Sequence, residues 1–189
     1  MNVARILYPV RVLGPGNRIG IWLCGCNRKC PGCSNPELWM PQKKYEIQVD
    51  HLLELINQVW SANRIDGFTI SGGEPFLQSE ELSSFIERIH HISCDILVYT
   101  GFTLQELRQK KDPFVERIIS SISVLVDGPY LQDQNENVFL RGSKNQCVYI
   151  LNEKYRMKYD NYLENGKNEI QNFISKDGVI SVGIHRKDF

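Results

Sequence analysis

A regular alternation of strand-like and helix-like segments constrains the fold more than any other feature of this sequence. Four short, mostly apolar runs have the composition of buried strands, and they occupy residues 18–23, 67–71, 95–100 and 122–128. The intervening segments have the spacing or the capping residues of helices, and they lie at residues 49–60, 79–89 and 103–120. Strands that alternate with helices form βαβ units, so the sequence predicts an α/β fold with a mainly parallel sheet.

Capping residues indicate where two of these helices begin. Ser79 is a good N-cap, because Glu80 and Glu81 follow it in the first turn, where the helix dipole favours negative charge. Thr103 and Glu106 have the spacing of a capping box, in which each side chain bonds the backbone amide of the other residue. We therefore expect helices to start at these two positions.

The last third of the chain is less regular. Residues 130–146 are polar and predict a long loop, and residues 155–168 predict a loop or a surface helix. Further strands are expected at residues 147–151 and 178–184. Because no repeat, low-complexity tract or flexible linker divides the sequence, we expect one domain over residues 1–189.

Composition argues against two classes of partner. The chain has 22 basic and 22 acidic side chains and no formal net charge, whereas nucleic-acid binding depends on a surplus of Lys and Arg. No window approaches the roughly 20 apolar residues of a membrane-spanning helix, and the N-terminus lacks the apolar run of a signal peptide. We therefore expect a cytoplasmic protein that binds neither nucleic acid nor a membrane.

Six cysteines are the anomaly of the composition. Thiols stay reduced in the cytosol, so a cluster of them more often binds a metal or does chemistry than forms disulfides. Four of the six lie between residues 24 and 33, in the run WLCGCNRKCPGCSN. Cys94 and Cys147 stand alone downstream, and we expect both to be inert buried thiols.

Cys26, Cys30 and Cys33 form a Cys-x3-Cys-x2-Cys pattern on a turn that contains Pro31 and Gly32. Three thiolates at this spacing can converge on one centre, and the pattern favours an iron–sulfur cluster. A [4Fe–4S] cluster normally takes four thiolates, one for each iron. Three thiolates leave one iron open, which is typical of a catalytic rather than a structural metal site.

Two other interpretations of the cysteines stay open on this reasoning. Cys24 lies two residues before Cys26 and would share its face of an extended strand, so the four thiols could bind zinc. Structural zinc usually needs a second, separated pair of ligands, and neither the downstream cysteines nor the four histidines supply one: His51, His90, His91 and His185. The remaining alternative is a group of plain buried thiols.

The turn SGGEP at residues 71–75 directly follows one of the predicted strands. Paired glycines at the end of a parallel strand let a ligand approach the backbone, and Glu74 could accept hydrogen bonds from an ammonium group. The motif alone is also typical of an ordinary tight turn, which is its simpler interpretation. Combined with three cysteines one strand earlier, it predicts an open iron beside a groove for an amino-acid-like ligand.

The combination of CxxxCxxC with a GGE turn resembles the radical S-adenosylmethionine superfamily. Within it, seven sequence blocks resemble the activating proteins of anaerobic ribonucleoside-triphosphate reductase, in family order: YPV at 8–10, GPGNR at 14–18, GCNRKCPGCSNPELW at 25–39, ISGGEP at 70–75, VYTGFTLQEL at 98–107, VLVDGPYLQD at 124–133 and RGSKNQ at 141–146. The resemblance implies a partial β/α barrel with a core over about residues 7–150 and a C-terminal extension over residues 151–189.

The resemblance implies an enzyme that activates a glycyl radical enzyme. A reduced [4Fe–4S] cluster on Cys26, Cys30 and Cys33 would bind S-adenosylmethionine and cleave it, and the resulting radical would take hydrogen from a glycine. The implied partners are the large glycyl radical subunit of an anaerobic ribonucleotide reductase and a low-potential electron donor such as a flavodoxin or ferredoxin.

The resemblance also implies cofactor contacts. Gly32, Cys33 and Ser34 would line the cofactor, and Gly72, Gly73 and Glu74 would hold its methionyl end. Four residues would lie on its nucleoside side: Tyr99, Thr100, Asp127 and Gly128. The block 141–146 has no derived role, and a loop pinned by Arg and Asn hydrogen bonds is the simpler interpretation. Cys24 is expected to be a spare thiol that is sensitive to oxidation.

Two rival functions belong to different classes. One is another small radical enzyme that acts on a different glycyl radical enzyme, a peptide or a small molecule. The other is a non-enzymatic iron–sulfur or zinc-binding module. The chain is short for a full eight-unit barrel, which favours a site left open for a protein loop.

Overall fold

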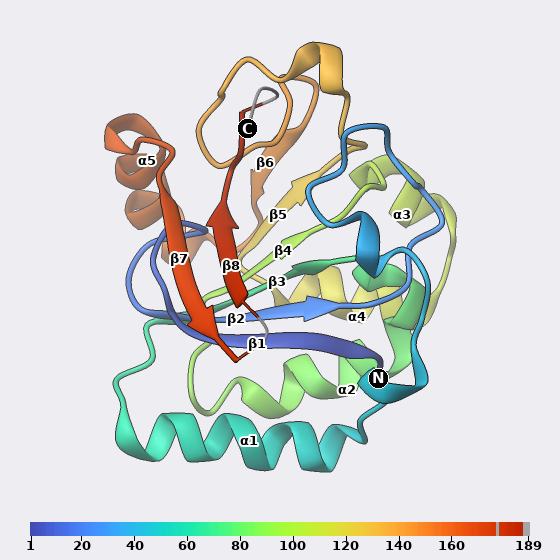
Figure 1. Cartoon of the computed structure of the whole chain (residues 1–189), viewed down its shortest axis with the longest axis vertical. Helices are drawn as coiled ribbons and strands as arrows, with labels where there is room; N and C mark the ends of the chain where they lie inside the picture. The colour runs from blue at the N-terminus through green and yellow to red at the C-terminus, as the bar shows by residue number, and fades with distance from the viewer. Residues whose placement is uncertain (177, 187–189) are drawn as a thin grey trace.

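The computed structural model describes residues 1–176 and 178–186, and its centre is a six-stranded sheet (Figure 1). The strands lie in sequence order across the sheet: β1 (Val3–Val10), β2 (Arg18–Leu23), β3 (Gly67–Gly72), β4 (Ile96–Tyr99), β5 (Val124–Asp127) and β6 (Cys147–Ile150). The four strands β2 to β5 run parallel, and β1 and β6 pair antiparallel at the edges. The predicted mainly parallel sheet is confirmed.

The two edge strands of this sheet are not paired with each other in the described ranges. The partial barrel therefore stays a prediction. Strand β1 was not predicted, because seven of its eight residues are only half-buried and give no clear alternation. Residues 177 and 187–189, which belong to the expected C-terminal extension, lie outside the described residues.

Helices cover both faces of the sheet. They are α1 (Val49–Ala62), α2 (Ser79–Ile89), α3 (Leu104–Gln109), α4 (Pro113–Ser121) and α5 (Arg156–Asn165). Side chains alternate along β2, so Ile21 joins the main core with α1, α2 and α4, whereas Trp22 faces the opposite side. That opposite side is covered by α5 and by a hairpin of β7 (Ile170–Ser175) and β8 (Gly178–Gly183), drawn in red in Figure 1.

The start of α3 confirms the capping box. The Thr103 hydroxyl accepts a hydrogen bond from the Glu106 amide at 3.1 Å, and the Thr103 amide donates to the Glu106 carboxylate at 2.6 Å. The prediction of Ser79 as an N-cap is wrong, because a 3-10 turn at Pro75–Gln78 leads directly into α2 and makes Ser79 a helical residue. Its hydroxyl instead donates to Asp112, the residue that caps α4.

The amino-terminal edge of the parallel strands holds a fully buried ion pair. Arg18 has no exposed surface, and its guanidinium lies 3.1 Å from the carboxylate of Asp95. Lys158 and Tyr159 of α5 donate to the same carboxylate at 2.5 Å and 2.6 Å. The segment expected to be a loop or surface helix is therefore a helix, and buried Tyr159 ties it to the sheet.

No helix in the part of the chain that the structure describes is long and apolar enough to cross a membrane.

Candidate functional site

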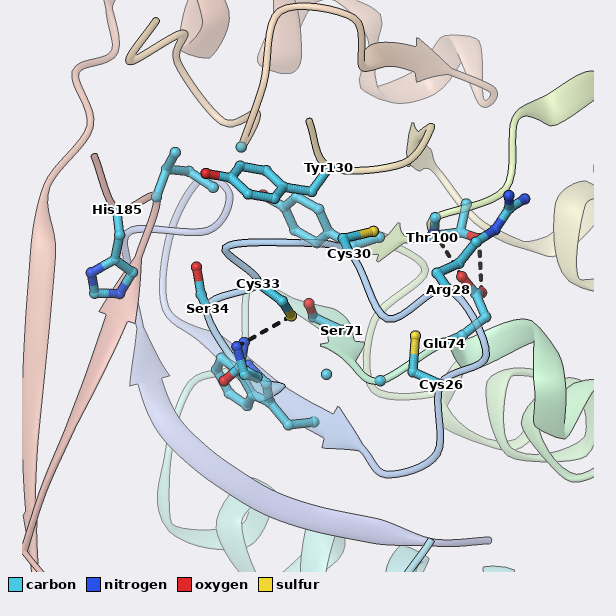
Figure 2. A pocket seen from close by; sticks show the side chains of 18 of the residues that line it. Cys26, Arg28, Cys30, Cys33, Ser34, Ser71, Glu74, Thr100, Tyr130 and His185 are labelled. Carbon is cyan, nitrogen blue, oxygen red and sulfur yellow. Dashed lines mark hydrogen bonds between the residues drawn. The ribbon is translucent and has the colours of Figure 1, made fainter. Parts of the chain in front are cut away.

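One pocket lies at the carboxyl-terminal ends of the parallel strands, where α/β proteins usually bind ligands (Figure 2). The segments that follow β2, β3, β4 and β5 all contribute lining residues, and residues 181–185 close another side. The segment after β2, residues 24–34, carries Cys24 and the three cysteines of the Cys-x3-Cys-x2-Cys pattern, and it is called the cysteine loop below. The topology thus brings together motifs that lie far apart in the sequence.

The thiols of Cys26, Cys30 and Cys33 all line this pocket and are half-buried. Figure 2 shows their sulfur atoms around one open part of the pocket. A tight turn brings the last two together, with the Cys33 amide donating to the Cys30 carbonyl at 3.1 Å and Gly32 at φ +70°. The Asn35 amide donates to the Cys33 sulfur at 3.4 Å, and burial raises the pKa of the Cys30 thiol.

The arrangement of the thiols bears on the two metal interpretations. Within residues 1–176 and 178–186, no three His, Cys, Asp or Glu side chains are grouped closely enough to hold a single metal ion. Zinc needs its sulfur ligands converged at about 2.3 Å from one point. A cubane cluster takes one thiolate at each of several irons, so its ligands surround a larger volume. Three thiols around one open space are a donor set that fits a cubane cluster with one iron left open.

The other three cysteines lie outside the pocket lining. Cys24 is buried, and its thiol donates to the carbonyl of Met40 at 3.0 Å, so it faces away from the three thiols and fits no ligand role. Cys94 is half-buried. Cys147 is exposed, which corrects the expectation of a buried thiol: it begins β6, an edge strand whose residues alternate between exposed and half-buried.

The paired glycines are required by the backbone of the neighbouring strand. A Cβ atom on Gly72 would lie 2.3 Å from the Leu23 carbonyl oxygen, and one on Gly73 would lie 2.3 Å from that of Gly25. The amides of Gly73 and Glu74 donate to the same two carbonyls at 2.8 Å. The turn therefore fixes the start of the cysteine loop against the end of β3, and both glycines line the pocket.

Glu74 is completely buried at the base of the pocket. One oxygen accepts hydrogen bonds from the Thr100 hydroxyl at 2.8 Å and the Phe76 amide at 3.1 Å. The other oxygen accepts from the Gly101 amide at 2.7 Å. Burial raises the pKa of this carboxyl, although the three hydrogen bonds favour its charged form. The side chain ties the ends of β3 and β4 together.

Most of the predicted site residues come together in the pocket. Ten of them line it: Cys26, Cys30, Cys33, Ser34, Gly72, Gly73, Glu74, Tyr99, Thr100 and Gly128. Gly32 instead lines a second, adjoining cavity. Asp127 does not line either cavity, because its carboxylate accepts hydrogen bonds from the amides of Leu104 and Cys147 at 2.6 Å and 3.3 Å. The neighbouring Gly128 lines the pocket.

Sequence reasoning missed a clamp on the cysteine loop. Arg28 lies between the cysteines, lines the pocket and donates to both carboxylate oxygens of Glu106 at 2.9 Å. Its guanidinium also stacks over the ring of Phe102, 4.3 Å from the centroid. The clamp joins the loop to the start of α3. No local pattern could have found it, because the two charged residues are 78 positions apart.

The block at residues 141–146 is a pinned loop, as its simpler interpretation held. The Gln146 side chain accepts from the Gly142 amide at 2.8 Å and donates to the Gly128 carbonyl at 2.8 Å. Arg141 donates to the Gln146 carbonyl, and Asn145 donates to the carbonyl of the residue after Gly128, at 2.9 Å and 2.8 Å. Gly142 and Gln146 also line the pocket.

Comparison with known protein families shows to which class of protein the chain belongs. A model described as a 4Fe-4S single cluster domain matches residues 12–149, which include the three pocket cysteines. The fold and the three thiols therefore define the class of this protein: an iron–sulfur protein with an α/β fold.

The particular family follows from two named relatives. The anaerobic ribonucleoside-triphosphate reductase-activating protein of Escherichia coli K12 is 32% identical over 153 residues, covering 76% of this chain and 96% of that protein. Its counterpart in Pasteurella multocida is 34% identical over 156 residues, covering 75% and 93%. A more distant relative, the pyruvate formate-lyase 1-activating enzyme of Escherichia coli K12, is 25% identical over 150 residues, covering 68% and 61%. The chain belongs to the family of anaerobic ribonucleoside-triphosphate reductase-activating proteins.

Proposed function

We propose that this chain cleaves S-adenosylmethionine reductively and generates a glycyl radical on the large subunit of an anaerobic ribonucleoside-triphosphate reductase. The observation that carries the proposal is the meeting of three half-buried thiols and the Gly72–Gly73 turn in one pocket, in a chain of this family. Cys26, Cys30 and Cys33 would hold a [4Fe–4S] cluster. When bound, the cluster supplies an open iron for the amino and carboxylate groups of S-adenosylmethionine and the electron that breaks its sulfonium bond.

The residues of the turn position the methionyl end. The amides of Gly73 and Glu74 are bonded to protein carbonyls, so they are not available to a ligand. The ligand would instead contact the open edge of the turn, with the Glu74 carboxylate behind it. An ionised carboxylate has about four acceptor positions, and three are filled in Glu74. Because the Glu74 carboxylate has no exposed surface, it would place a negative charge behind the turn and would not bond the ligand directly.

The walls of the pocket would surround the ligand on several sides. Ser34, Thr100 and Gly128 come from three different strand ends and line one enclosure with the thiols. The electron would come from a low-potential flavodoxin or ferredoxin in the cytoplasm, and the sheet would be part of a radical S-adenosylmethionine-type partial barrel. The mouth of the pocket would receive the glycine-bearing loop of the reductase.

Anaerobic reconstitution tests the proposal. We expect about four irons per chain, formation of 5′-deoxyadenosine with a strong reductant, and a glycyl radical signal in electron paramagnetic resonance when the reductase subunit is added. One zinc per chain without 5′-deoxyadenosine would contradict the enzyme assignment. 5′-Deoxyadenosine without a glycyl signal would contradict the assigned substrate and favour a different radical enzyme.

A further inference from the structure

The clamp between Arg28 and Glu106 places two opposite charges beside the cysteine loop. Arg28 lies midway between the first two cysteines of the pattern, two residues from Cys26 and two from Cys30. Glu106 belongs to the first turn of α3, so the two charges come from different parts of the fold. Charges this close to a site act on it even without contact, because Coulomb interactions fall off slowly at the partly buried positions of a protein.

The stem of Arg28 is packed against the wall of the pocket. A Cβ atom on Gly101 would lie 3.0 Å from the Arg28 Cγ atom and 3.4 Å from a carboxylate oxygen of Glu74, so the stem lies where the ends of β3 and β4 meet. Figure 2 shows the side chain of Arg28 extending from there away from the open space between the sulfur atoms. Arg28 therefore acts on that space through its charge rather than as a ligand.

The guanidinium of Arg28 is only partly hydrogen-bonded. One nitrogen, Nη2, makes both bonds to the Glu106 carboxylate, each at 2.9 Å. Nε, which is the guanidinium nitrogen nearest to the Arg28 backbone along the side chain, is buried and has no hydrogen-bond partner among the residues that the structure describes. Unpaired buried donors are uncommon in proteins. Glu106 thus compensates the cation from the side of α3, and the side toward the loop keeps an unpaired N–H.

A second cation and a second carboxylate lie close to the clamp. The Lys110 ammonium lies 3.5 Å from the centroid of the Phe102 ring, over which Arg28 also stacks. Buried Glu74 lies beside the Arg28 stem. Two positive and two negative groups are therefore gathered at this side of the pocket. Because they nearly balance, removing either charge of the clamp leaves an excess of the opposite sign next to the cysteine loop.

We propose that the Arg28–Glu106 clamp sets the reduction potential of the cluster that we assign to the three pocket cysteines. The inference rests on the proposed function and deepens it, since cleavage of S-adenosylmethionine requires a reduced cluster. Accepting one electron adds one negative charge to the cluster, and its potential depends on the net charge around it. Arg28 favours the reduced state, and Glu106 opposes it. Both act as positioning residues, through the field that they create at the loop.

Redox titration of the reconstituted full chain, followed by electron paramagnetic resonance, tests the inference. Arg28→Gln removes the positive charge and should lower the midpoint potential, whereas Glu106→Gln removes the negative charge and should raise it. Glutamine also serves in a capping box, so Glu106→Gln keeps the start of α3. Arg28→Lys keeps the charge and should leave the potential close to that of the wild type. Arg88→Gln, at the exposed pair with Asp50, is the matched control and should not shift it.

The signs of the shifts separate a charge effect from a loosened loop. Arg28→Gln and Glu106→Gln both weaken the hydrogen bonds of the clamp, so a purely structural role would change both variants in the same direction. Shifts of one sign, no shift in either variant, or an equal loss of iron from both would overturn the inference. So would a shift in Arg28→Lys as large as that in Arg28→Gln.

Two further comparisons keep the test decisive. Should Arg28→Gln alone fail to hold a cluster, Glu106→Gln and Arg28→Lys still decide, because only Glu106→Gln is expected to raise the potential. Iron analysis of the wild type precedes the titration. A wild type without a four-iron cluster would contradict the proposed function, whereas a normal cluster with unshifted potentials in the variants would contradict the inference alone.

Discussion

The two ends of the parallel strands each bury a carboxylate, but they satisfy it differently. At the amino-terminal edge, Asp95 is 1% exposed and is bonded by Arg18, Lys158 and Tyr159. At the carboxyl-terminal edge, Glu74 is 0% exposed, and among the described residues its hydrogen-bond donors are one hydroxyl and two backbone amides. One carboxylate has cationic partners, and the other has neutral ones.

This difference separates stability from function. A buried ion pair with all its hydrogen bonds made is a closed unit, and removing one partner leaves the other charge uncompensated. A buried carboxylate with neutral donors still attracts a cation, and S-adenosylmethionine, the ligand that we propose, carries a positive charge on its sulfonium group. The amino-terminal edge thus stabilises the fold, while the carboxyl-terminal edge carries the pocket to which we assign the proposed function.

Cys30→Ala has the largest expected effect and acts at the carboxyl-terminal edge alone. We expect iron binding and 5′-deoxyadenosine formation to be lost, because a cluster cannot be held by the remaining two thiols at Cys26 and Cys33. The thermal unfolding of the iron-free chain should hardly change, since the thiol is half-buried. Iron analysis and calorimetry measure the two effects. Cys147→Ser, which alters an exposed thiol, is the control, and a Cys30→Ala protein that still forms 5′-deoxyadenosine would refute the ligand assignment.

Asp95→Asn is expected to lower stability and to leave iron binding intact, the opposite of Cys30→Ala. It leaves Arg18 buried without a counter-charge, which should lower the free energy of unfolding by about 3–5 kcal/mol. The folded fraction should still bind iron normally. Denaturant unfolding gives the stability, and Asp50→Asn at the exposed pair with Arg88 should cost less than about 1 kcal/mol. Equal losses in the two variants would show that burial does not set the strength of the pair.

Local sequence rules predicted the elements at both edges but not the contacts between them. The βαβ alternation and the Thr103–Glu106 capping box depend on residues close in sequence, so their periodicity is visible in the chain. Arg18 and Asp95 are 77 positions apart, and no spacing marks them as partners. The same holds for the clamp of Arg28 on Glu106.

The candidate site was predicted as far as its motifs extend. The three cysteines and the glycine turn carry their own patterns, and the structure places them in one pocket. Asp127 was misplaced because a strand-end carboxylate can cap neighbouring backbone as well as face a ligand, and here it does the former. The strand at residues 178–184 was predicted and corresponds to β8, but its place beside the pocket was not, and its partner β7 was missed because β7 is largely exposed and lacks a buried apolar stripe.

Glu74→Gln should have a smaller effect on stability than Asp95→Asn. The amide nitrogen would replace one carboxylate oxygen, and a donor would then face either the Gly101 amide or the donors on the other oxygen. We expect a loss of about 1–3 kcal/mol. The variant should also bind S-adenosylmethionine more weakly, which isothermal titration would measure.

The pH dependence of the unfolding free energy should differ between the wild type and Glu74→Gln. Burial raises the pKa of Glu74 above its ordinary value of 4.5, so between that value and the raised one the folded chain holds a proton that the unfolded chain has released. The contribution of Glu74 to stability therefore falls as pH rises through that window. Glu74→Gln has no such proton, so its unfolding free energy should fall less over the same range. A wild type and a variant with parallel pH profiles would contradict the raised pKa.

Thr103→Ala has the smallest expected effect. It changes a residue that stabilises a helix and also lies next to the cysteine loop. It removes a helix cap, like a stability residue, but its partner Glu106 also holds Arg28 of the cysteine loop. Loss of the cap should cost about 1 kcal/mol. Because the two bonds from Arg28 to Glu106 remain, iron content should stay normal while the midpoint of denaturant unfolding falls. Thr103→Ser restores the hydroxyl and should restore the midpoint. A marked loss of iron in Thr103→Ala would mean that the start of α3, rather than the glycine turn, fixes the position of the cysteine loop.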